Sequence, residues 1–162
     1  MTDGAPRAAL ADALVLLGRR DFTEAALRER LAKRDHDAAS VEHAVAKCVG
    51  YGYIDDHAWG LARAVELFRR RPLGRSALRH DLRRYGLTPT MAEQVADEAY
   101  AGHGGEGAVL ADALQRWVVG KGPPTEWRSI RRCSGHLQRR GFAASDIQAA
   151  LSPWLDELST RG

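Results

Sequence analysis

Residues 50–56 read Gly50-Tyr51-Gly52-Tyr53-Ile54-Asp55-Asp56, and this stretch joins two predicted helices. Glycine takes left-handed backbone dihedrals without a Cβ clash, so the glycines predict the end of the first helix. Asp55 and Asp56 then offer side-chain oxygens to the free N–H groups of the second helix. We therefore interpret the stretch as a joint between helical units, in which Asp55 and Asp56 are structural caps that set the angle between those units.

Outward from this joint, almost every segment has helical periodicity and none alternates over a strand length. We predict nine helices, which makes the fold class all-α. In the first helix the pattern places Leu10, Leu14 and Leu17 on the buried face. The buried face of the fourth helix is expected to contain Ala58, Leu61, Ala62, Val65 and Phe68. In the ninth helix we expect Pro153 to cause a kink or to split off the last turn.

The middle helices of three successive segments end in the same pattern. In each, an apolar residue is followed four positions later by a leucine. A lysine or arginine stands two positions after that leucine, and a glycine or aspartate stands two positions further on. The central leucines of this pattern, Leu31, Leu82 and Leu137, lie 51 and 55 residues apart. Self-similarity at such a spacing is typical of tandem repeats, which stack because one unit cannot bury its own apolar face.

The predicted architecture is a tandem array of three three-helix repeats, elongated and curved. The repeats span residues 8–54, 55–101 and 106–158, and residues 102–105, Gly-His-Gly-Gly, form a glycine-rich hinge. The first repeat has Asp35 where the others have Gly86 and Gly141. Because aspartate tolerates the left-handed conformation less well, we expect that helix end to be built differently.

Composition favours a cytoplasmic protein without a membrane segment. The 162 residues are 44% hydrophobic and 28% charged with a net charge of +3, and no run approaches the ~18 apolar residues of a membrane span. The apolar stretch at residues 8–17 contains Asp12 and is followed, not preceded, by Arg19 and Arg20, which is the wrong order for a signal peptide. The two cysteines, Cys48 and Cys133, fit buried small hydrophobic positions.

No motif in the sequence predicts catalysis. The six histidines are scattered, and no phosphate-binding glycine loop or nucleophile motif is present. Asp55, Asp56 and His57 resemble metal ligands only in residue type, because neighbouring helical residues point in different directions. We expect no enzyme activity, no metal and no cofactor.

Clustered arginines are the strongest functional signal. Arg75, Arg79 and Arg83 recur at every fourth position and predict a stripe along one helix, which Arg84 extends. Arg131, Arg132 and Arg139 crowd the corresponding helix of the third repeat. These residues form either a solvated charged face or a surface that contacts phosphate backbone or an acidic protein groove. Trp59, off the apolar stripe of its helix, fits either an exposed interface or packing between repeats.

The order and spacing of several short motifs resemble the RecX family of bacterial regulatory proteins. The resemblance covers residues 8–155 and rests on Gly52-Tyr53-Ile54-Asp55-Asp56, Arg71-Pro72-Leu73-Gly74, Arg139-Arg140-Gly141-Phe142, and Arg20-Asp21-Phe22-Thr23 followed by Leu27 and Leu31. It implies a cytoplasmic, monomeric, non-enzymatic modulator of the recombinase RecA, with a role in homologous recombination and DNA repair. Proteins of this family bind the RecA–DNA filament, inhibit ATP hydrolysis and strand exchange, and limit filament growth or promote disassembly.

Two alternatives stay open from the residues alone. One is a basic helical protein that binds single- or double-stranded DNA without a recombinase partner, in which case affinity falls steeply with salt. The other is a repeat scaffold for an unrelated protein partner, in which case charge reversal of the arginine stripe leaves binding intact.

Overall fold

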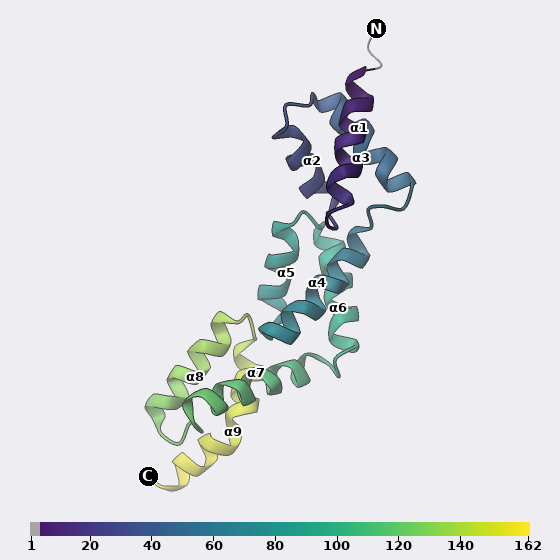
Figure 1. Cartoon of the computed structure of the whole chain (residues 1–162). Coiled ribbons are helices and arrows are strands. Elements are labelled where there is room, and N and C mark those ends of the chain that lie inside the picture. Colours follow the sequence, from purple (N-terminus) through teal and green to yellow (C-terminus); the bar gives the residue numbers. More distant parts are fainter. Residues whose placement is uncertain (1–3) are drawn as a thin grey trace. The chain divides into compact units, whose positions relative to one another are not determined.

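The computed structural model describes residues 4–162, and this part of the chain forms nine α-helices without a strand (Figure 1). Their bounds are α1 Gly4–Leu17, α2 Glu24–Ala32, α3 Ala38–Gly50, α4 Asp56–Arg70, α5 Arg75–Arg84, α6 Pro89–Ala101, α7 Glu106–Lys121, α8 Trp127–Arg139 and α9 Ala144–Thr160. The predicted all-α class is confirmed.

The described residues fall into two compact units. One consists of the residues up to Ala62 together with Leu82–Ala92, and the other consists of Arg63–Asp81 together with Glu93–Gly162. The repeat boundaries that we place at residues 54–55 and 101–106 stay predictions, as does the hinge at residues 102–105.

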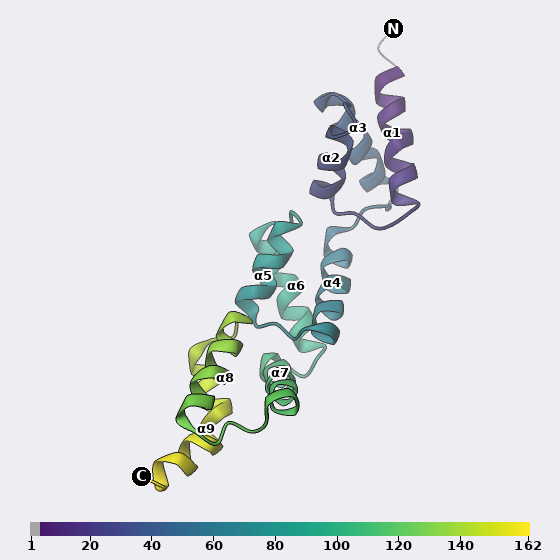
Figure 2. The same ribbon diagram turned by 60° about the vertical axis from the view of Figure 1, so that its left-hand side comes forward.

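In the first unit, α1 packs along α3, and α2 packs against both (Figure 2). Their shared core contains Ala9, Ala13, Leu16, Phe22, Leu27, Leu31, Val41, Ala44, Val45, Cys48 and Ile54. The predicted buried face of α1 was wrong for Leu14, which is 41% exposed, whereas Leu10 and Leu17 are partly buried and pack against this core. Ala9 and Ala13 are fully buried. Small side chains on the contact face let two helix backbones approach closely, so alanine occupies the core although leucine is the more hydrophobic residue.

A similar shift occurs in α4. Gly60, Ala64 and Phe68 are buried at every fourth position, whereas Ala58 and Val65 are exposed. The predicted stripe was therefore correct for Phe68 and wrong for Ala58, Ala62 and Val65, which are all exposed, while Leu61 is half-buried. In both helices the contact face consists largely of small residues, which carry a weak hydrophobic signal.

In the second unit, α7 packs against α8 and α9, and α9 continues unbroken through Pro153. Proline has no N–H for the carbonyl four residues earlier, which here belongs to Ala149. The hydroxyl of Ser152 donates to that carbonyl at 2.8 Å, so the oxygen keeps a partner. Pro153 itself is exposed, and the predicted split of α9 at this residue was wrong.

A glycine contact ends α5 and recurs at the end of α8. Gly86 has a φ of 95°, and a Cβ placed on it would overlap the side chain of Ala25 in the first turn of α2. Gly141 has a φ of 91°, and a Cβ there would overlap the backbone of Ala77 in the first turn of α5. We call these two sites the glycine junctions; only glycine satisfies both the dihedral and the space.

A hydrogen bond between neighbouring segments accompanies each glycine junction. In the first, the buried hydroxyl of Thr23 donates to the carbonyl of Tyr85 at 2.5 Å. In the second, the N–H of Gly74 donates to the carbonyl of Arg140 at 2.8 Å. Asp35, at the equivalent end of α2, also has a left-handed φ of 63°, so the expected difference from the glycines was wrong for its backbone dihedral.

Candidate functional site

Arg75, the first residue of the predicted arginine stripe, is surrounded by acidic side chains. Its Nη1 lies 2.6 Å from a carboxylate oxygen of Glu93 and 2.7 Å from one of Asp97. Its backbone N–H donates to Glu106 at 3.0 Å, and its guanidinium lies 5.3 Å from the ring centre of Tyr100. Arg75 therefore links α5 to α6 and to the start of α7, and its charge is locally neutralised.

Arg79, one turn later, shares Glu93 with Arg75. Its Nη1 lies 2.8 Å from the second carboxylate oxygen of Glu93. Hydrogen bonds from Arg79 and Arg75 hold the pKa of Glu93 below its usual value. Arg83 and Arg84 are exposed and form no ion pair within residues 4–162. The stripe thus divides into a neutralised half at Arg75 and Arg79 and an unpaired half at Arg83 and Arg84.

The second predicted group lies on α8. Arg131, Arg132 and Arg139 are all exposed, and none of them pairs with a carboxylate in the described part of the chain. Arg132 and Arg139 are seven residues apart on one helix, so they share a face. These side chains are available for contact with an anionic surface.

The two aspartates of the joint bond to different helices. Asp55 accepts a hydrogen bond at 3.0 Å from the N–H of Ala58 and so caps α4. Asp56 accepts one at 2.9 Å from the N–H of Glu24, the first residue of α2. Burial raises the pKa of the Asp56 carboxyl. Whether these bonds fix the angle between the repeats stays a prediction.

Aromatic side chains gather near the same joint in the first unit. The ring of half-buried Trp59 lies 4.9 Å from that of Tyr85, within the same predicted repeat. An interface role for Trp59 and packing between repeats both stay predictions. Tyr51 and Tyr53 are more than half exposed, with ring centres 5.7 Å apart.

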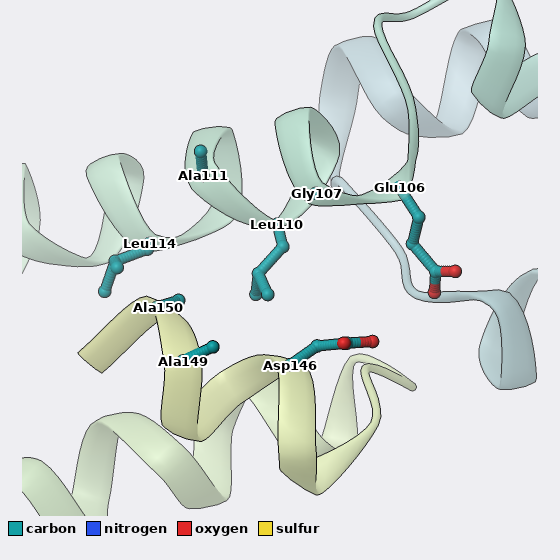
Figure 3. A pocket seen from close by; sticks show the side chains of 8 residues that line it. All are labelled: Glu106, Gly107, Leu110, Ala111, Leu114, Asp146, Ala149 and Ala150. Atoms are coloured by element: carbon teal, nitrogen blue, oxygen red, sulfur yellow. The ribbon is translucent and has the colours of Figure 1, made fainter. Parts of the chain in front are cut away.

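An apolar groove lies between α7 and α9 (Figure 3). Figure 3 shows Leu110 and Leu114 of α7 on the side of that helix that faces Ala149 and Ala150 of α9. The groove has a volume of about 520 Å³. Glu106 and Asp146 lie at one end, and Glu106 is already bonded to the N–H of Arg75. The groove resembles a packing surface more than a reaction centre.

Sequence reasoning missed a second hollow, which is lined by cationic residues of the loop after α4, of α7 and of α8. The arginines at positions 70–71 and 139–140 are visible as separate pairs in the sequence. The sequence did not mark Arg116 and Lys121 as binding candidates, because each is an isolated cation on a helix of mixed apolar and polar composition. Only the fold brings these residues together.

Two further surveys apply to residues 4–162. No helix in that range has the length and apolar character that crossing a membrane requires. No group of three or more histidine, cysteine or acidic side chains there could hold a metal ion.

The chain is similar in sequence to known proteins of one family. Residues 9–48 match the family model described as RecX, first three-helix domain. The chain is 34% identical over 143 residues to the regulatory protein RecX of Syntrophotalea carbinolica, covering 87% of this chain and 93% of that protein. It is 31% identical over 164 residues to the regulatory protein RecX of Halorhodospira halophila, covering 98% of this chain and 96% of that one.

The fold agrees with that of solved RecX structures. A crystal structure of a regulatory protein RecX superposes with a TM-score of 0.78 at 18% identity, over 92% of this chain and 72% of that one. Identity above 30% across nearly the whole of two relatives, together with the matching first three-helix domain, is sufficient for an assignment. The chain belongs to the RecX family of regulatory proteins.

Proposed function

We propose that this protein binds the RecA–DNA filament and inhibits the ATPase and strand-exchange activities of RecA, which limits filament growth or promotes disassembly. The observation that carries the proposal is the whole-length similarity to regulatory proteins RecX. On this proposal the protein is a cytoplasmic monomer that acts by binding and not by catalysis.

The charge distribution indicates which arginines would make the contacts. Arg83 and Arg84 on α5, and Arg131, Arg132 and Arg139 on α8, are exposed and unpaired within the described residues. Such side chains can bond to carboxylates of a protein groove or to DNA phosphates. Arg75 is occupied by three carboxylates, so we place it outside the binding surface.

The test is the ATPase rate of RecA on single-stranded DNA while the protein is added in increasing amounts. We expect a dose-dependent fall. The ratio at which the fall saturates separates capping of filament ends from coating of their length. An unchanged rate, with the protein shown to be folded and helical, contradicts the proposal.

Charge-reversal variants connect this activity to the arginines. The double variant Arg83→Glu with Arg84→Glu should inhibit the RecA ATPase less strongly at equal helicity, because it reverses the charges of the two unpaired arginines of the stripe. The matched control reverses two other exposed cations without an ion pair in the described residues, Arg19→Glu with Lys47→Glu, and changes net charge equally. Equal inhibition by both double variants would show that Arg83 and Arg84 are only solvated.

The runner-up function is DNA binding without a recombinase, which the same exposed arginines favour. Affinity for DNA alone that falls steeply as salt rises would support it. Binding that requires the filament would instead support the regulator.

A further inference from the structure

The hollow lined by cations, which we call the basic hollow, has a volume of about 280 Å³. It lies wholly within the second unit, between the end of α4 and the helices α7 and α8. Its cationic and titratable lining residues are Arg70, Arg71, Arg116, Lys121, His136 and Arg140. The side chain of Trp117 lines it as well, and none of the residues that line it is acidic.

Two of these cations are compensated by partners outside the lining. Arg70 lies 2.9 Å from a carboxylate oxygen of Glu66. Arg116 lies 3.1 Å from Asp112 and also donates to the carbonyls of Arg69 and Arg70, at 3.0 and 3.2 Å. Arg116 therefore holds the C-terminal end of α4 against α7 and fixes one wall of the hollow.

Three cations are not compensated. Arg71, Lys121 and Arg140 have no acidic partner within residues 4–162. Arg140 is half-buried, and its Nη1 is fully buried without a hydrogen-bond partner. Buried polar groups are normally satisfied, and a buried donor left without an acceptor destabilises the fold. The backbone carbonyl of Arg140 accepts a hydrogen bond from the N–H of Gly74 in the second glycine junction, which fixes the position from which its side chain extends.

Apart from burial, only positively charged neighbours shift the pKa of His136 in α8 and of Arg140, the residue that follows α8. Burial and the charge of Arg71 lower the pKa of Arg140. Burial and the charges of Arg140, Arg139 and Arg71 lower the pKa of His136. A half-buried arginine and histidine beside the exposed Arg71 and Lys121, without an internal counter-ion, give the hollow a positive potential that an external anion would relieve.

We propose that the basic hollow is a phosphate-binding site, and that the phosphate belongs to a single-stranded DNA chain or to a nucleotide. The planar guanidinium groups of Arg71 and Arg140 present forked donors that match phosphate oxygens, and Lys121 adds a point charge from α7. The indole of Trp117 gives the attached sugar or base an apolar surface within the same hollow. This site is separate from the exposed arginines assigned to filament binding, and it does not depend on RecA.

The test uses the whole protein in buffer free of phosphate and follows the imidazole signals of His136 by NMR. Inorganic phosphate, ATP, a single-stranded oligonucleotide and chloride at matched ionic strength are added separately. A bound phosphate stabilises imidazolium, so the pKa of His136 should rise with phosphate ligands and not with chloride. A response to ATP alone identifies a nucleotide as the source, and a response to the oligonucleotide alone identifies the DNA backbone.

The Arg71→Gln variant removes one forked donor from a loop position where the arginine is exposed. We expect its affinity for the effective ligand to fall about tenfold or more, since charge-assisted hydrogen bonds are lost. The control Arg128→Gln removes an equal charge from an exposed position of α8 outside the hollow and should bind as the wild type does. The variant Arg71→Gln should also be no less stable than the wild type, because like-charge repulsion is relieved.

Two results would overturn the proposal. One is a His136 response that chloride reproduces at the same ionic strength. The other is equal loss of affinity in Arg71→Gln and Arg128→Gln, which would show that only net charge matters. Neither result bears on RecA inhibition, because that activity is measured on different residues and a different readout.

Discussion

Gly141 combines two constraints at one residue, a left-handed φ of 91° and contact with the backbone of Ala77. Gly141→Ala should lower the free energy of unfolding by about 2–4 kcal/mol, from steric overlap of about 1–3 kcal/mol together with the left-handed strain of a non-glycine residue. Urea unfolding followed by circular dichroism measures the loss.

The matched control is Gly52→Ala. Gly52 also ends a helix with a positive φ, here 76°, but nothing lies within 4 Å of a Cβ placed there. This variant should lower the free energy of unfolding by only about 1 kcal/mol, from backbone strain. Equal losses in the two variants would mean that the contact with Ala77 adds nothing to stability.

At the residue scale, Arg75 and Arg83 show what the sequence could predict and what it could not. Their spacing on one helix predicted a common stripe, because helical periodicity is a local property. It could not predict that Glu93, Asp97 and Glu106 would neutralise Arg75, since these acids come from later helices whose position depends on packing. The basic hollow was hidden for the same reason.

At the scale of the element, Thr23 serves two helices. Its hydroxyl oxygen accepts from the N–H of Ala26 at 3.1 Å, which caps α2, and the same hydroxyl donates to the carbonyl of Tyr85 at the end of α5. Thr23→Ala leaves both groups without a partner at a fully buried position and should lower the free energy of unfolding by about 2–3 kcal/mol.

Thr23→Ser retains the hydroxyl and is the control for Thr23→Ala. This variant should lower the free energy of unfolding by only about 1 kcal/mol, because it removes a single methyl group. Thermal and urea unfolding of both variants give the comparison. A serine variant as unstable as the alanine variant would show that the methyl group, and not the two hydrogen bonds, stabilises the first glycine junction.

The helices themselves were predictable because each has its own caps and breaks, such as Thr23, Thr88-Pro89 and Gly120 to Pro124 in the chain. Their buried faces were less predictable. In α1 and α4 the contacts use alanine and glycine, whose periodicity is masked by leucines and valines on neighbouring faces. In α9, the hydroxyl of Ser152 donates to the Ala149 carbonyl that Pro153 leaves without its backbone donor, a local bond that helix propensity alone does not predict.

At the scale of the whole molecule, several carboxylates couple stability to pH in the same direction. The pKa of Asp12 is lowered mainly by a hydrogen bond to His36, that of Glu66 by Arg69, and that of Glu93 by Arg79. Their stabilisation is present above their ordinary values of 3.8 to 4.5 and is lost as pH falls through the folded values. Asp56, whose pKa is raised by burial, opposes this trend.

We therefore expect the urea midpoint to decrease as pH falls from about 5 towards 2, where paired carboxylates become protonated. The variant Glu93→Gln should be less stable than the wild type at pH 7, and the difference should shrink in acid. A midpoint that stays level over this range, or a Glu93→Gln deficit that persists at pH 2, would contradict this assignment.

The glycine junctions also make the chain extensible. The proposed second repeat carries both halves of a junction, a closing glycine at Gly86 and a small residue at Ala77 in the first turn of its middle helix. A duplicate of residues 55–101 would thus bring its own docking surfaces, and repeats could be added without a new interface. A duplicate of the first repeat would fail, because Asp35 places a side chain where the junction has room for none. We therefore expect that the protein could be lengthened by whole proposed repeats, provided that the middle helix of each copied repeat ends in glycine.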